Sequence, residues 1–238
     1  MLNNFMKTAV TAALLVSGIH AASAESVQVN VIGTIVPAAC TPTLSGGGVV
    51  DYGNIKASTL SADAYTLLPV KSLDFAISCD APARVALHAV NDRPGTLAGG
   101  EVANGVGKAP VNVFGNTSGL YPVVGLGLDG TKKIGGYGLT ITGGTVTADG
   151  NPVDSITNAQ NDGTGTWYSS GKGLGAGTPF SWTPRSISWA QTGTLVPVAF
   201  KTLAGKLDVQ AYINKASELD LSHAVKLDGQ TTLEVVYL

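Results

Sequence analysis

Apolar and polar residues alternate with a period of two in several short segments of the chain, which is the pattern of half-buried β-strands. Gly, Pro, Asn or Asp residues bound these segments, and no segment of helical length has an apolar period of 3.6 residues. Only residues 215–222 indicate a short helical turn. The alternating segments are 26–36, 72–79, 84–90, 121–128, 136–142, 195–200, 206–213 and 231–238.

Short strands separated by turns predict an all-β fold, an antiparallel sandwich. Gly accounts for 31 of the 238 residues, about 13% against a usual share of roughly 7%. Residues 93–186 are rich in Gly, Thr, Asn and Asp and lack a dense apolar pattern of their own. We therefore expect one domain, residues 37–238, decorated by long Gly-rich loops or an insertion at 93–186.

The last predicted strand has an unusual position. Leu233, Val235 and Tyr237 alternate with more polar neighbours, and the chain stops at Leu238 without a turn or a following strand. The sequence pattern by itself leaves open which strand pairs with this edge.

The first 24 residues have the pattern of a secretory signal. A short polar region with Lys7 precedes an apolar run of 11 residues, and Ala22 and Ala24 occupy the small-residue positions of a cleavage site. The run is well short of the roughly 20 residues that span a bilayer. We expect cleavage before Glu25, the alternative being a short anchor helix.

Two cysteines remain after the signal, Cys40 and Cys79. An even number in an exported protein favours a disulfide. A metal site is the alternative, but two thiols without clustered histidines or CxxC spacing make a poor one. The formal net charge of −2 gives no reason to expect a nucleic-acid or anionic-lipid partner.

Several motifs together resemble those of chaperone–usher fimbrial subunits, or pilins. "VIGTIVPAAC" precedes the first cysteine, "VVDYGNI" follows a Gly-rich turn, Cys79 ends a predicted strand, and Tyr237 is the penultimate residue. The resemblance covers residues 25–92 and 195–238. "ACTPTLSGGGVVDYG" and "ISCDAPARVALHAVNDR" are similar to a fimbrial-like branch often labelled as a domain of unknown function.

The resemblance implies an immunoglobulin-like sandwich that lacks its last strand and takes one from another molecule. Residues 25–36 would be the donor-strand extension, although their alternation also suits an ordinary first strand of a closed fold. The donor residues would be Val27, Val29, Val31, Gly33 and Ile35, and the chaperone-binding edge would comprise Leu233, Val235, Tyr237 and Leu238. Implied partners are a periplasmic chaperone, an outer-membrane usher and other copies or related fimbrial subunits.

On this basis the sequence predicts a structural subunit of a cell-surface fimbrium, exported through the periplasm of a Gram-negative bacterium and contributing to cell adhesion. It does not specify a receptor. Two alternatives stay open: a small outer-membrane β-barrel, and a free-standing exported β-sandwich binding protein. In the second alternative, a ligand platform would comprise Trp167, Tyr168, Trp182 and Trp189.

The sequence predicts neither catalysis nor a cofactor or metal. Residues 125–130 match GxGxxG, and Asp149 lies beyond them, but the residues that follow indicate a turn and a strand instead of a helix. His88 and His223 have no nucleophile motif beside them. Asp149, Asn151 and Asp154 lack the spacing of a calcium loop and are better explained as a turn.

Overall fold

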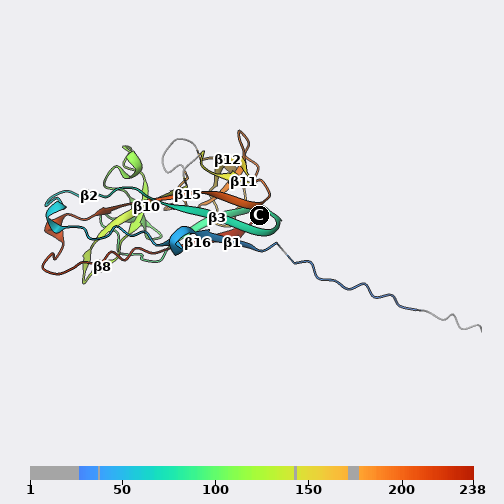
Figure 1. Ribbon diagram of the computed structural model, residues 1–238, viewed down its shortest axis with the longest axis horizontal. Coiled ribbons are helices and arrows are strands. Elements are labelled where there is room, and N and C mark those ends of the chain that lie inside the picture. The colour runs from blue at the N-terminus through green and yellow to red at the C-terminus, as the bar shows by residue number, and fades with distance from the viewer. Residues whose placement is uncertain (1–26, 37, 142–143, 171–176) are drawn as a thin grey trace, which may run out of the picture. The chain divides into compact units, whose positions relative to one another are not determined.

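The computed structural model describes residues 27–36, 38–141, 144–170 and 177–238 (Figure 1). The chain divides into two compact units, Met1–Val36 and Pro37–Leu238. The predicted signal peptide, residues 1–24, and the predicted new N-terminus at Glu25 lie outside the described residues. In the described part of the second unit, all regular structure consists of strands and short 3₁₀ turns, so the predicted all-β fold is confirmed.

One layer of the fold is centred on two long antiparallel strands, β3 and β15, which run side by side in Figure 1. β1 pairs with β3, β10 pairs with β15, and β7 pairs with β10. The short strand β2 pairs with the end of β15. The strands of this layer are β1 (Cys40–Leu44), β2 (Thr66–Leu67), β3 (Lys71–Ala83), β7 (Pro122–Gly125), β10 (Gly135–Ile141) and β15 (Phe200–Ile213).

The other layer follows the order β16, β4, β14, β12 and β13. β11 (Thr147–Ala148) pairs with both β12 and β15 and so connects the two layers. All of these strand pairs are antiparallel, as expected for a sandwich. The strands of the second layer are β4 (Val85–Asn91), β12 (Asn151–Asn158), β13 (Trp167–Ser169), β14 (Ser186–Gln191) and β16 (Thr231–Tyr237).

The main core lies between the two layers and is built around Trp189. This side chain on β14 is fully buried. Its ring centroid lies 6.2 Å from that of Phe75 on β3 and 6.1 Å from that of Phe200 on β15. Aromatic pairs at these separations add to the stabilisation from buried apolar area. Trp189 is therefore a core residue, which removes it from the hypothetical ligand platform.

Residues 93–186 are more ordered than their composition suggests. They contain β7, β10 to β13 and four further short strands: β5 (Glu101–Ala103), β6 (Val106–Lys108), β8 (Leu128–Asp129) and β9 (Lys132–Lys133). They also contribute most of a second apolar cluster, which the sequence pattern did not predict. Its buried members are Leu97, Ala109, Val113, Tyr121, Val123 and Tyr212.

Glycines on β10 make room for this second cluster. A Cβ atom on Gly138 would lie 2.9 Å from the ring of Tyr121, and one on Gly136 would lie 2.6 Å from the side chain of Leu97. Only glycine permits such a close approach to a strand. The high glycine content therefore serves packing as well as turns.

The strand predicted at residues 195–200 is wrong. Residues 195–199 form no strand, only an isolated bridge between Pro197 and Ala190, and β15 begins at Phe200. Residues 49–55 also lack strand pairing. The short helical turn is confirmed as η4 (Ala216–Glu218); the other 3₁₀ turns are η1 (Ser45–Gly48), η2 (Ala57–Thr59) and η3 (Val113–Gly115).

Candidate functional site

Several strands have an unpaired edge in the described part of the chain, among them β16 and β1. β16 pairs there with β4 alone, and β1 pairs with β3 alone. The outer N–H and C=O groups of such an edge are available to another strand, and exposed edges of this kind favour association with other chains. The space between these two edges is therefore the candidate site.

A groove of about 360 Å³ lies between the segment after β1 and the segment that leads into β16. Its floor comes from β10 and β15, through the apolar side chains of Leu139, Leu207 and Val209. One wall includes Val50, and the opposite wall includes Leu233. An apolar floor between two strand-like walls is suited to alternate apolar side chains of an added strand.

A second hollow of about 600 Å³ continues the groove. The two hollows share Val50, Tyr52 and Leu227. The second one is more polar, because His223 and Lys226 line it together with apolar residues. We call the two hollows together the edge groove.

Tyr52 explains why residues 49–55 form no strand. Its hydroxyl donates a hydrogen bond to the carbonyl of Val209 (3.2 Å) and accepts one from the amide of Ala211 (3.1 Å). These backbone groups lie where the partner of β15 changes from β3 to β2. The Tyr52 hydroxyl thus makes the hydrogen bonds that the backbone of a pairing strand would otherwise make at this point. Burial raises the pKa of the Tyr52 hydroxyl, which keeps it protonated.

The opposite wall, residues 219–230, was missed by the sequence analysis. It has no strand pairing within the described residues. Several of its odd-numbered side chains are nevertheless partly buried while their even-numbered neighbours are exposed, as in β16. The signal that could have found it is this alternation, interrupted by His223 and Gly229. The inward apolar positions of the wall and β16 are Leu219, Val225, Leu227, Leu233 and Val235.

The wall is also connected to the groove floor. Tyr137 on β10 hydrogen-bonds through its hydroxyl to the hydroxyl of Thr231, the first residue of β16. Burial raises the pKa of Tyr137 to about 12. A Cβ atom on Gly229 would lie 2.7 Å from the Tyr137 ring, so glycine lets the chain pass close to the floor.

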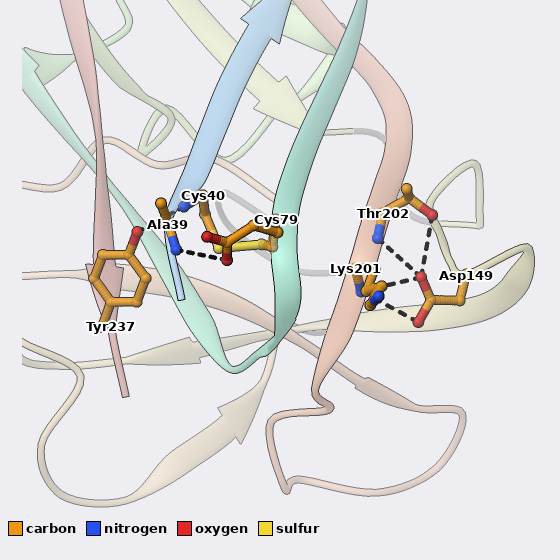
Figure 2. Close-up of a disulfide and its surroundings, with 8 residues drawn as sticks. Ala39, Cys40, Cys79, Asp149, Lys201, Thr202 and Tyr237 are labelled. Atoms are coloured by element: carbon orange, nitrogen blue, oxygen red, sulfur yellow. Dashed lines mark hydrogen bonds between the residues drawn. A yellow bond between two sulfur atoms is a disulfide. The ribbon is translucent and has the colours of Figure 1, made fainter. Parts of the chain in front are cut away.

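Tyr237 connects the two edges near one end of the fold. Figure 2 shows its hydroxyl beside the backbone of Cys40, whose amide donates a hydrogen bond to it at 2.7 Å. Cys40 is opposite Cys79 in the β1–β3 register, and the predicted disulfide between them is confirmed. The end of β16 is therefore fastened to the start of β1.

Tyr237 is 47% exposed, so truncation of its side chain would remove little packing. Tyr237→Phe is expected to lower the free energy of unfolding by about 0.5–1.5 kcal/mol, because it removes the hydrogen bond from the Cys40 amide. Urea denaturation monitored by fluorescence measures this change. Tyr168→Phe, at a position 56% exposed, is the control; equal stability of the Tyr237 variant and the wild type would contradict the prediction.

The proposed donor residues belong to the first unit. Residues 27–36 form no strand, and the side chains of Val27, Val29, Val31 and Ile35 are between 84% and 99% exposed. A Cβ atom added to Gly33 would have no other atom within 4 Å, apart from those of the two residues next to it in the chain. An ordinary first strand of a closed sandwich would bury either its odd-numbered or its even-numbered side chains. In residues 27–36 both sets are exposed.

The other sequence candidates have structural roles. Gly125 and Gly130 of the GxGxxG match lie at the end of β7 and in the β8–β9 hairpin, a setting without a helix. The Asp149 carboxylate accepts hydrogen bonds from the amides of Lys201 (3.1 Å) and Thr202 (2.8 Å), as Figure 2 shows, and the Thr202 amide is the main cause of its lowered pKa. His88 contacts the carbonyl of Arg185 through Nδ1 at 2.9 Å.

The described residues contain no group of three or more His, Cys, Asp or Glu side chains arranged to hold a metal ion. Among them, too, no helix has the length and apolar character needed to cross a membrane.

Comparison with known proteins places the chain in a family. Residues 29–138 match the family described as "Protein of unknown function (DUF1120)". Protein GltF of Escherichia coli (strain K12) is 32% identical over 99% of this chain and 98% of its own length. Uncharacterized protein YhcF of the same organism is 28% identical over 94% of this chain and 98% of its own length. No solved structure matches. Because residues 29–138 match the DUF1120 family and GltF is 32% identical over nearly the whole length of both chains, this chain belongs to the DUF1120 family.

Proposed function

We propose that this protein is a structural subunit of a chaperone–usher type surface fimbrium, which polymerises by donor-strand exchange and contributes to cell adhesion. The observation that carries the proposal is a pair of complementary features in one chain. The edge groove has an apolar floor and lies between the segments next to β1 and β16, two strands whose outer edges are unpaired in the described residues. Residues 27–35 carry alternate apolar side chains that are exposed.

The dimensions of the two features are compatible. Nine extended residues, 27–35, span about 27 Å at roughly 3.4 Å per residue, and the seven residues of β16 span about 20 Å. The donor segment of one copy is therefore long enough to pair along the whole of β16 in another. Full burial of a Val or Ile side chain is worth about 1.5–3 kcal/mol, so Val27, Val29, Val31 and Ile35 together supply a substantial driving force.

Before assembly the open edges need protection, since an apolar groove with unpaired backbone groups favours aggregation. In the proposal a periplasmic chaperone covers the edge that carries Leu233, Val235, Tyr237 and Leu238, and an outer-membrane usher receives the complex. The donor segment of the next subunit then replaces the chaperone. The mature protein would be located at the cell surface.

The direct test adds a synthetic peptide of residues 25–36 to the folded subunit. At a peptide concentration of 100 Kd the complex gains about 2.7 kcal/mol, which corresponds to a rise in Tm of roughly 5–10 °C for a domain of this size. A peptide with Gly33→Arg is expected to have no effect, because its charge would enter an apolar cleft. Calorimetry measures both.

A matched pair of subunit variants locates the binding. Leu227→Arg places a charge in the wall of the edge groove and is expected to abolish the Tm rise. Val102→Arg places the same charge at another exposed apolar position, on β5, and is expected to preserve it. A wild-type peptide that leaves Tm unchanged, or an equal response of the two variants, would contradict the proposal.

A further inference from the structure

Hydrogen bonds and ion pairs hold the wall formed by residues 219–230 to the neighbouring elements, and two of these attachments carry charge. Near its β16 end, the Asp228 amide donates to the carbonyl of Leu126 at 2.9 Å. The Asp228 carboxylate also accepts two hydrogen bonds from Arg93, both of 3.0 Å. Because arginine stays charged at every physiological pH, this attachment is insensitive to pH in that range.

The second attachment depends on a histidine. His223 Nε2 lies 3.0 Å from Oδ2 and 3.1 Å from Oδ1 of Asp129, which belongs to β8. His223 Nδ1 lies 3.8 Å from the carboxylate of Asp220 in the same wall. His223 also lines the second hollow of the edge groove. One imidazole therefore connects the wall of the groove to the β8–β9 hairpin.

We propose that the His223–Asp129 contact is a pH-dependent latch on the wall of the edge groove. With His223 protonated, the wall is fastened to β8 and residues 219–227 are held in place. With His223 neutral, the ion pair is lost and this part of the wall opens more often. A second statement rests on the proposed function: the fastened wall is preorganised for an incoming strand, so the donor segment binds more tightly when the latch is closed.

The charges around His223 determine the direction of the effect. Asp129 on β8 is the main cause of its raised pKa, and Asp220 adds to it. Lys132 on β9 interacts with Asp220, while Asp51 and Lys226 line the same hollow. Because the pKa in the folded protein is raised above the unfolded value of about 6.5, the latch is closed below that pH. It is lost as the pH rises through the folded-state pKa.

Hydrogen exchange of the full-length exported chain tests the latch without reference to assembly. After correction for intrinsic rates, amides of residues 219–227 are expected to exchange about two- to five-fold faster at pH 8.5 than at pH 5.5. This ratio corresponds to the free energy that a partly exposed ion pair contributes. His223→Gln should exchange fast at both values. His223→Lys, which keeps its charge, should stay slow at both. Asp228→Asn should raise exchange near residue 228 equally at both values.

Equal wild-type exchange at the two pH values, or an unchanged pH dependence in His223→Gln, would overturn the latch. Binding of the 25–36 peptide tests the second statement: Kd should be about two- to five-fold lower at pH 5.5 in the wild type and independent of pH in His223→Gln. If exchange depends on pH but peptide Kd does not, the latch stands and the preorganisation statement fails. If the peptide binds at neither pH while exchange responds, the proposed function fails and the latch stands.

Discussion

A chain that lacks residues 25–35 is expected to fold normally and to lose fibre assembly completely. Residues 27–35 form no strand, and their apolar side chains are exposed. Their removal should therefore change the free energy of unfolding by no more than about 0.5 kcal/mol, as for other exposed positions. In the proposed assembly, the truncated subunit would keep its edge groove but would have nothing to insert into the groove of its neighbour. Co-purification with the chaperone and electron microscopy of surface fibres measure the two outcomes.

The same deletion distinguishes the proposed assembly from a closed fold. In a closed sandwich these four apolar side chains would belong to an internal strand, and the loss of burial at about 1.5–3 kcal/mol each would exceed much of the stability of a typical domain. The truncated chain would then fail to accumulate. A control chain with Val27, Val29, Val31 and Ile35 all replaced by Ser keeps its length and should behave like the deletion. Wild-type fibres from either variant would refute donor-strand exchange.

Removal of the disulfide by Cys40→Ala with Cys79→Ala is expected to destabilise the fold by about 4 kcal/mol. The bond closes a loop with a sequence separation of 39 residues, and the chain-entropy relation gives about that value for such a loop. Loss of the disulfide also affects the edge groove directly. β1 pairs only with β3 in the described chain, so the cross-link holds one wall of the edge groove in place.

Urea denaturation of the purified subunit measures this loss. Thr41→Ala, an exposed position on β1, is the matched control and should change the free energy of unfolding by less than about 0.5 kcal/mol. A double alanine variant within 1 kcal/mol of the wild type would contradict the entropic estimate. Loss of peptide binding in a double variant that is still folded would connect the disulfide to the shape of the groove.

The strands with clear alternation were predictable because the signal is local. In β3 and β16, successive side chains meet different environments, so the period of two is visible in the sequence. The disulfide followed from the number of cysteines in a chain with a predicted export signal. β14 was missed although Ser186 to Trp189 alternate between polar and apolar residues: the alternation covers only four residues, and the structure buries its polar members, Ser186 and Ser188, as well.

The edge groove needed the tertiary structure. Alternation in β16 indicates an edge but not which elements face it, since the floor residues on β10 and the wall near Tyr52 are far away in the sequence. Hydrogen bonds such as that from the Tyr52 hydroxyl to Val209 replace strand pairing without any local pattern. The same holds for His223 and Asp129, which are 94 residues apart. The sequence by itself determined the strands with clear alternation, such as β3 and β16, the cysteine pair and the apolar alternation before Cys40. Only the packing of the two layers decided where the free edges lie and what lines the space between them, because those contacts are made by residues distant in the chain.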